Sequence, residues 1–316
     1  MRKYRTYIVV AVALVILVVM PQLVSSYYVR LLSIILIYSI FAMSLDIILG
    51  YGGLPSLGHA ASFGAAAYMV AILNVKVLHA GSFGVELAAG IVFAALVAAL
   101  FGPLALRTRG IYFLMVTLSL SMVLWAIAFK WRLLTGGDDG IPRIAPPQLS
   151  FLPWDFSLPM NYYYFILFFF ILAVVLMVLI VNSPFGHVLV GIHENETRMA
   201  SMGYNVWLYK YIAIIIAGSF AGLAGILVAY YNTFVSPSVL HISTSAEGLI
   251  MVILGGQGTL FGPAIGAGII VLVKHLLSTY TDRWPMILGM IFILVIILAP
   301  QGIYRLIKRY LLGTRI

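Results

Sequence analysis

The chain has 316 residues, of which 63% are hydrophobic and 9% are charged, with a net charge of +9 and a mean hydropathy of +1.12. Soluble domains carry about 45–50% apolar and about 25% charged residues, so this composition excludes a soluble enzyme and a disordered chain. The chain has no cysteine, which excludes a disulfide-built module, a thiolate metal site and a cysteine nucleophile. We expect a single all-α polytopic membrane domain over residues 1–316.

Basic residues gather at both ends of the chain. Three of the first five residues are basic, and four basic residues lie within the last twelve. Because loops rich in Lys and Arg stay on the cytoplasmic side, both termini are expected in the cytoplasm, which makes the number of crossings even. The apolar run from Ile8 to Val24 is longer than the core of a signal peptide, so we expect it to be a span and not a cleaved leader.

A helix needs about 20 apolar residues to cross a bilayer. Ten stretches meet or approach this requirement. In chain order they are 7–24, 30–49, 57–74, 86–106, 110–130, 161–181, 210–231, 246–257, 262–280 and 285–300. The eighth is too short to cross alone, so eight spans are the alternative, with 246–280 as a re-entrant pair and a less simple crossing in 47–75.

Two glycine-rich segments, 48–58 and 253–262, break the apolar pattern in a similar way. Interrupted spans at corresponding places in a transporter mark the substrate path, because their free N–H and C=O groups can bind a zwitterion without charged side chains. The alternative is two tight turns between close-packed helices. The candidate residues of the substrate path are Gly52, Gly53, Ser56, Gly58, Gly255, Gly256, Gln257 and Gly258.

Two hydrophilic segments separate the later spans. The first, 131–160, is rich in Pro and Gly and is expected outside the cell. The second, 182–209, is expected in the cytoplasm. Within it, Pro184 is suited to open a helix and Gly203 to end one, so 186–202 is expected to form one short helix parallel to the membrane. This segment is either an ordinary connector or a docking surface for a soluble partner. The candidate docking residues are Glu194, Asn195, Glu196, Thr197, Arg198 and Gly203.

The seventh span carries small residues at 218, 222 and 225, which are typical of close helix packing. Asp46 and Glu247 are the candidate buried acids that an ion-coupled carrier would need. Both lie near span ends beside glycine-rich sequence, so capping of helices at the membrane interface is the alternative. Two isolated acids make a weak proton relay, which favours an energy source supplied by a partner.

Several kinds of chemistry are missing from the sequence. None of the six lysines follows a glycine, so there is no Walker A phosphate loop. The six histidines show neither HExxH spacing nor a helical pair, and His187 and His193 are interpreted as solvated structural residues. We therefore expect no catalytic residues, no metal site, no bound cofactor and no nucleic-acid partner.

Four motifs occur in order: GGLPSLGHAA at 52–61, TGGDDGI at 135–141, the loop 183–205, and ILGGQGTLFGP at 253–263. Together they make the chain resemble the permeases of branched-chain amino acid ABC importers, of the LivM type, over about residues 30–302. The four ordered motifs are specific as a set, whereas each alone is weak.

The resemblance implies an ABC importer permease fold in the plasma (inner) membrane. It implies import of leucine, isoleucine and valine delivered by an external binding protein. It also implies a sister permease of the LivH type and two ATPase subunits of the LivG and LivF types. The ATPase subunits hydrolyse the ATP, and the segment 186–203 is the coupling loop that contacts one of them. The Glu-Ala-Ala-x3-Gly motif of many ABC permeases would fall on 197–203, where only Gly203 is kept.

Two other functions compete with this one. Urea or short-amide importers have permeases with much of the same pattern, and an ion-coupled amino acid carrier would need no partner subunits. Uptake competition between leucine and urea distinguishes the first, and transport by the purified chain alone distinguishes the second.

Overall fold

The computed structural model describes residues 15–77, 82–147, 156, 158–280 and isolated positions near the C-terminus (283, 286–287, 289–290, 293 and 302–304). This part of the chain is mostly helical, and seven of its helices are long and apolar enough to cross a membrane. They are α2 (Ser26–Asp46), α3 (His59–Ile72), α4 (Phe83–Ala105), α5 (Ile111–Lys130), α7 (Pro159–Val181), α10 (Val206–Asn232) and α12 (Phe261–Tyr280). Two of them continue as π-helical turns: α2 into η1 (Ile47–Tyr51) and α3 into η2 (Leu73–Val77).

Shorter elements join the long helices. They are α6 (Arg132–Thr135), η3 (Gly137–Asp139), β1 (Ile141–Pro142), α8 (Pro184–Glu194), α9 (Glu196–Ser201), β2 (Phe234–Val235), η4 (Pro237–Leu240) and α11 (Ile242–Gly255). The strands β1 and β2 pair antiparallel, with Ile141 opposite Val235 and Pro142 opposite Phe234. The motif TGGDDG at 135–140 folds as compact turns, with positive φ at its three glycines.

Seven of the ten expected spans coincide with long helices. The eighth, expected to be short, is α11 with 14 residues. Of the first span, 7–24, residues 15–23 are helical and 7–14 lie outside the described residues, as does most of the last span, 285–300. A polytopic membrane protein is confirmed in outline, while the count of ten stays a prediction.

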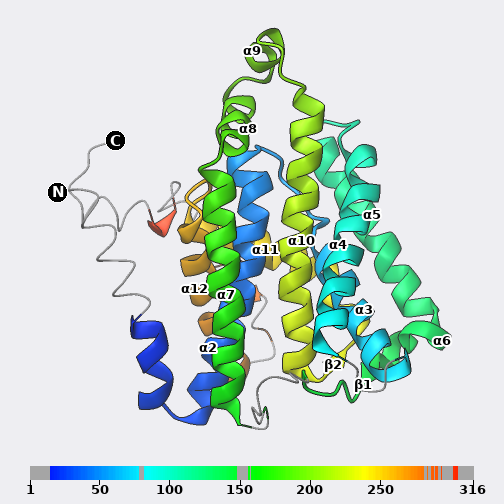
Figure 1. Cartoon of the computed structure of the whole chain (residues 1–316), viewed down its shortest axis with the longest axis vertical. Coiled ribbons are helices and arrows are strands. Elements are labelled where there is room, and N and C mark those ends of the chain that lie inside the picture. The colour runs from blue at the N-terminus through cyan, green and yellow to red at the C-terminus, as the bar shows by residue number, and fades with distance from the viewer. Residues whose placement is uncertain are drawn as a thin grey trace.

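The helix bundle has two distinct ends (Figure 1). At one end, α9 projects beyond the long helices, with α8 beneath it; we call this the α9 end. At the opposite end lie α6, β1 and β2; we call this the β end. Segments that the charge pattern assigns to one side of the membrane lie together. Arg109 is 3.6 Å from Glu196 at the α9 end, and the Lys76 ammonium donates to the Leu133 carbonyl at 2.7 Å at the β end.

The core is organised around α10, which packs against α2, α3 and α4. The small residues of α10 face those helices closely: Gly218 lies against Ala98, and Gly222 lies against Ala94. Gly225 lies against the backbone carbonyl of Phe63. A side chain at these positions would force the helix backbones apart, so the expected packing role of the small residues is confirmed.

Candidate functional site

The first glycine-rich break lets a helix start inside the bundle. After η1 the chain runs without regular structure over 53–58, and α3 begins at His59. Side chains of neighbouring helices satisfy backbone N–H groups that the helix start leaves open. The Leu57 N–H donates to Thr117 Oγ1 of α5 at 3.2 Å, and the Ala60 N–H donates to Ser245 Oγ of α11 at 2.9 Å.

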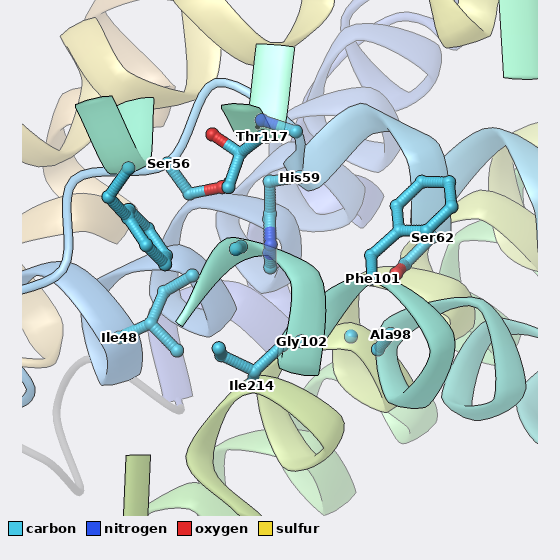
Figure 2. Close-up of a pocket in the computed structure, with 13 residues that line it drawn as sticks. Ile48, Ser56, His59, Ser62, Ala98, Phe101, Gly102, Thr117 and Ile214 are labelled. Atoms are coloured by element: carbon cyan, nitrogen blue, oxygen red, sulfur yellow. Dashed lines mark hydrogen bonds between the residues drawn. The ribbon is translucent and has the colours of Figure 1, made fainter. Parts of the chain in front are cut away.

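A small cavity of about 40 Å³ lies beside this helix start (Figure 2). Its polar lining is Ser56, His59, Ser62 and Thr117, and apolar residues of η1, α4, α5 and α10 complete it. His59 is buried, and its Nε2 lies 2.8 Å from Ser44 Oγ. A water molecule needs about 10–15 Å³ of such space, so the cavity has room for a few waters and not for an amino acid side chain.

The predicted path residues of the first break are divided between two places. Ser56 and Gly58 line the small cavity. Gly52 packs on the Ile48 carbonyl, and Gly53 has a φ of +66° and lies against α8. The first break therefore borders both the bundle interior and the α9 end.

Asp46 holds the second break against the first. Its carboxylate is fully buried and accepts the Gly258 N–H at 2.8 Å and the Leu260 N–H at 3.0 Å. Gly50 lies directly against the backbone of Gly258. The two breaks, far apart in sequence, are thus side by side. Asp46 is a capping group, as the alternative proposed, and its carboxylate is buried inside the protein.

The remaining predicted residues of the second break are fixed by backbone packing. Gly255 lies against the Gly262 carbonyl, Gly256 has a φ of +117°, and Gln257 is exposed. These positions do not line the small cavity as the structure describes it. Their arrangement supports tight turns between close-packed helices.

His193 connects α8 to the first break. Its Nδ1 lies 3.1 Å from the Gly50 carbonyl oxygen, so the tautomer with a proton on Nδ1 donates to it. The same imidazole covers Gly53, where an added Cβ would lie 2.6 Å from His193 Cδ2. His193 is exposed and makes a structural contact, which agrees with the interpretation as a solvated structural residue. Nothing in the local sequence signals this contact, because its partner precedes it by 143 residues.

The segment 186–202 is two helices and not the single one expected. Ser183 caps α8, and Pro184 takes its first position as predicted. At Asn195 the backbone is extended, with φ −157° and ψ 96°, and its side chain accepts the Arg198 N–H at 2.9 Å. An asparagine that caps a new helix in this way ends the preceding one. The single-helix prediction fails because it overlooked this capping geometry.

The short helix α9 is a surface element, since none of its residues is buried. Gly203 ends it with a φ of +88°, as expected. The Gly203 N–H donates to the Ala200 carbonyl at 3.0 Å, and the Tyr204 N–H to the Met199 carbonyl at 3.2 Å. This pair of bonds is the Schellman motif, which favours glycine at the left-handed position.

Glu196 fastens α9 to the rest of the chain. Its carboxylate lies 2.8 Å from the Lys210 ammonium of α10 and 3.6 Å from the Arg109 guanidinium. The neighbouring candidates Glu194, Thr197 and Arg198 are exposed. Of the predicted docking residues, Asn195, Glu196 and Gly203 therefore shape and position α9. Thr197 and Arg198 are exposed on α9, and Glu194 is exposed at the end of α8.

Glu247 lies in the middle of α11 and not at a span end as expected. Its carboxylate oxygens are 2.8 and 3.0 Å from the Lys274 ammonium of α12. Within the described residues, no group of three or more His, Asp or Glu side chains is placed to hold a metal ion.

A family profile described as the permease component of branched-chain amino acid transport systems matches residues 27–299. The chain belongs to this family. The match confirms the resemblance that the four motifs indicated.

Curated relatives agree with this membership. The permease is 30% identical over 311 residues to the high-affinity branched-chain amino acid transport system permease protein LivM of Salmonella typhimurium, with 92% of this chain and 73% of the relative covered. It is 29% identical, with the same coverage, to the protein of that name from Escherichia coli. A probable LivM of Methanocaldococcus jannaschii is 29% identical over 114 residues, covering 36% of this chain and 33% of the relative. No solved structure matches.

The permease thus has a continuous chain of contacts from its surface to its interior. Asn195 joins α9 to α8, and His193 joins α8 to Gly50. Gly50 lies against Gly258, which Asp46 holds. A displacement of α8 would act directly on both glycine-rich breaks.

Proposed function

We propose that this permease is a membrane subunit of an ATP-driven importer that translocates leucine, isoleucine and valine received from an external binding protein. The observation that carries the proposal is the family match over residues 27–299. The LivM relatives, which cover 92% of the chain, are named for branched-chain amino acid transport, and this favours these substrates over urea.

The energy is supplied by partner subunits. The chain lacks a Walker A loop, so two ATPase subunits of the LivG and LivF types hydrolyse the ATP, and a sister permease of the LivH type completes the pathway. In this proposal the exposed side chains of Glu194, at the end of α8, and of Thr197 and Arg198 on α9 face an ATPase. The contact through His193 then passes its movement to the two breaks.

The permease crosses the inner membrane ten times, with 7–24 and 285–300 as the first and last spans. Both termini and the α9 end face the cytoplasm, and the β end faces outward. The basic residues Arg109 and Lys210 at the α9 end support this orientation. Ser56 and Gly58 then line the cytoplasmic half of the substrate path, with the other glycine-rich positions beside it.

The absence of native cysteine allows a direct test of this orientation. Single cysteines at Ser201 of α9 and at Ser82, before α4, are expected to react with an impermeant thiol reagent from opposite sides of the membrane. Ser82 is expected to label in intact cells, and Ser201 only after the membrane is opened. Labelling of both from one side contradicts the orientation.

Transport is tested with the complete complex in proteoliposomes that contain the binding protein. We expect leucine uptake that requires ATP and both ATPase subunits and that excess urea leaves unchanged. Uphill leucine uptake by the permease alone, driven by a proton or sodium gradient, would falsify the proposal and support an ion-coupled carrier.

A further inference from the structure

A second and larger cavity, of about 580 Å³, opens between α2, α3, α10, α11 and α12. Its volume lies within the range of about 300–1,000 Å³ that is usual for small-molecule sites. Aromatic and aliphatic side chains are part of its lining, among them Tyr38, Phe63, Val239 and Ile250. The Glu247–Lys274 ion pair also lies in the lining, with Ser243 one turn of α11 before Glu247. The cavity therefore combines a broad apolar surface with one positive and one negative group.

The ion pair is unusual for its position. Glu247 lies in the apolar helix α11, Lys274 lies in the membrane-length helix α12, and their side chains are 14% and 36% exposed. Charged groups inside a membrane domain are costly even when paired, and they commonly mark substrate pathways. A pair needed only to hold α11 against α12 could be replaced by apolar contacts, which are plentiful between these helices. A ligand that binds to both charged groups would account for an ion pair at this position.

The cavity lies toward the β end, away from the small cavity. Its lining includes Asn232, the last residue of α10, and Ser238 of η4, which lie on either side of β2 in the sequence. Phe63 lines this cavity. The small cavity is lined by His59, one helical turn before Phe63, and by Ser62, the residue directly before it. The Phe41 ring packs against both Phe63 and His59, with centroids 4.9 and 5.2 Å apart. Aromatic side chains therefore separate the two cavities.

We propose that this cavity is a binding site for a zwitterionic amino acid with an aliphatic side chain. The ligand ammonium pairs with the Glu247 carboxylate, and the ligand carboxylate accepts from the Lys274 ammonium, which has three N–H donors. The zwitterion adds no net charge, so each charge of the site keeps an opposite partner. The aliphatic side chain of the ligand lies against Phe63, Val239 and Ile250. This inference rests on the proposed import of amino acids and adds a specific site to it.

Cysteine protection tests the site in the assembled complex without the binding protein. The variant Ser243→Cys places a thiol in the cavity, because Ser243 is an exposed part of the lining. Leucine is expected to slow its modification by a cationic methanethiosulfonate. The matched control Ser82→Cys carries an exposed thiol outside the cavity, and its modification is expected to be independent of leucine. Isocaproate, which lacks the ammonium, and isoamylamine, which lacks the carboxylate, are expected to protect Ser243→Cys poorly.

Variants of the ion pair distinguish binding from structural support. In the Ser243→Cys background, Glu247→Gln and Lys274→Gln are each expected to raise the leucine concentration for half protection about tenfold or more. The exchange Glu247→Lys with Lys274→Glu rebuilds the ion pair with reversed polarity, so it preserves helix packing while misplacing both ligand contacts. We expect protection to stay weak in this double variant, with assembly monitored by size exclusion.

Two results would overturn the inference. The first is equal leucine protection in the exchange variant and the parent, because the pair would then be purely structural. The second is the absence of any leucine effect on Ser243→Cys while the wild-type complex imports leucine with ATP. In that case the site is wrong and the proposed function stands. Failure of the wild-type complex to import leucine would instead refute the proposed function.

Discussion

Removing the Asp46 carboxylate should release the glycine-rich turn that it caps. The change Asp46→Asn keeps one acceptor oxygen and replaces the other with an NH2 group. One of the two backbone N–H groups, of Gly258 or of Leu260, then has no acceptor. A hydrogen bond to a charged group contributes about 1.5–3 kcal/mol, and an unsatisfied buried group costs about 1–3 kcal/mol. We expect Asp46→Asn to lower the free energy of unfolding by about 2 kcal/mol. Asp46→Ala, which loses both bonds of 2.8 and 3.0 Å, should lower it by about 4 kcal/mol.

Thermal unfolding of the purified permease, followed by intrinsic fluorescence, measures the effect. For a chain of 316 residues about 1 kcal/mol corresponds to a Tm shift of roughly 1–2 °C, so the Tm should fall from wild type to Asp46→Asn to Asp46→Ala. Asp138→Asn is the matched control, because Asp138 is exposed and should leave the Tm within about a degree. An unchanged Tm in Asp46→Asn together with lost transport would refute the capping role, since a proton-carrying acid would give that result.

Three further changes address other contacts. Glu196→Lys places a third positive charge beside Lys210 and Arg109, so complex yield and ATP-driven uptake should fall while membrane insertion persists. Adding Lys210→Glu should restore part of the yield and the uptake. No restoration would argue against the Glu196–Lys210 ion pair as the contact that positions α9. Gly203→Val forces a β-branched residue to adopt a φ of +88°. Uptake should drop because of this backbone strain, since no neighbouring atom crowds the position. Normal uptake would contradict the role of the Schellman motif at the end of α9. Gly222→Leu pushes α10 from Ala94 and should destabilise the permease by about 1–3 kcal/mol in the same thermal assay.

The long helices were predictable because a local property determines them. The apolar run at 110–130 becomes α5 at Ile111–Lys130, since a charge-free stretch of that length has few other ways to satisfy its backbone in a membrane. The left-handed end at Gly203 was predictable for a similar reason, because one residue type strongly favours that φ. The break at Asn195 was missed, although asparagine before Glu-Thr-Arg is a usable capping signal.

The contacts within the candidate site were not predictable from one sequence. The partners of Asp46 lie 212 and 214 residues later, and His193 meets a backbone carbonyl, which has no sequence identity of its own. The Glu247–Lys274 pair depends on how α11 turns back onto α12. Such contacts are determined by helix packing, which hydropathy and spacing do not specify.

The contact between Gly50 and Gly258 also limits which substitutions this permease can accept. A Cβ on Gly50 would meet main-chain atoms of Gly258, and a Cβ on Gly258 would lie 3.2 Å from the Gly50 carbonyl oxygen. A clash between two side chains can be relieved by a new rotamer or by a smaller neighbouring residue. A clash with backbone atoms cannot be relieved in either way, because every residue has the same backbone. No second-site change at the opposite glycine can therefore compensate for a larger residue at either position. Glycine is therefore required at both positions.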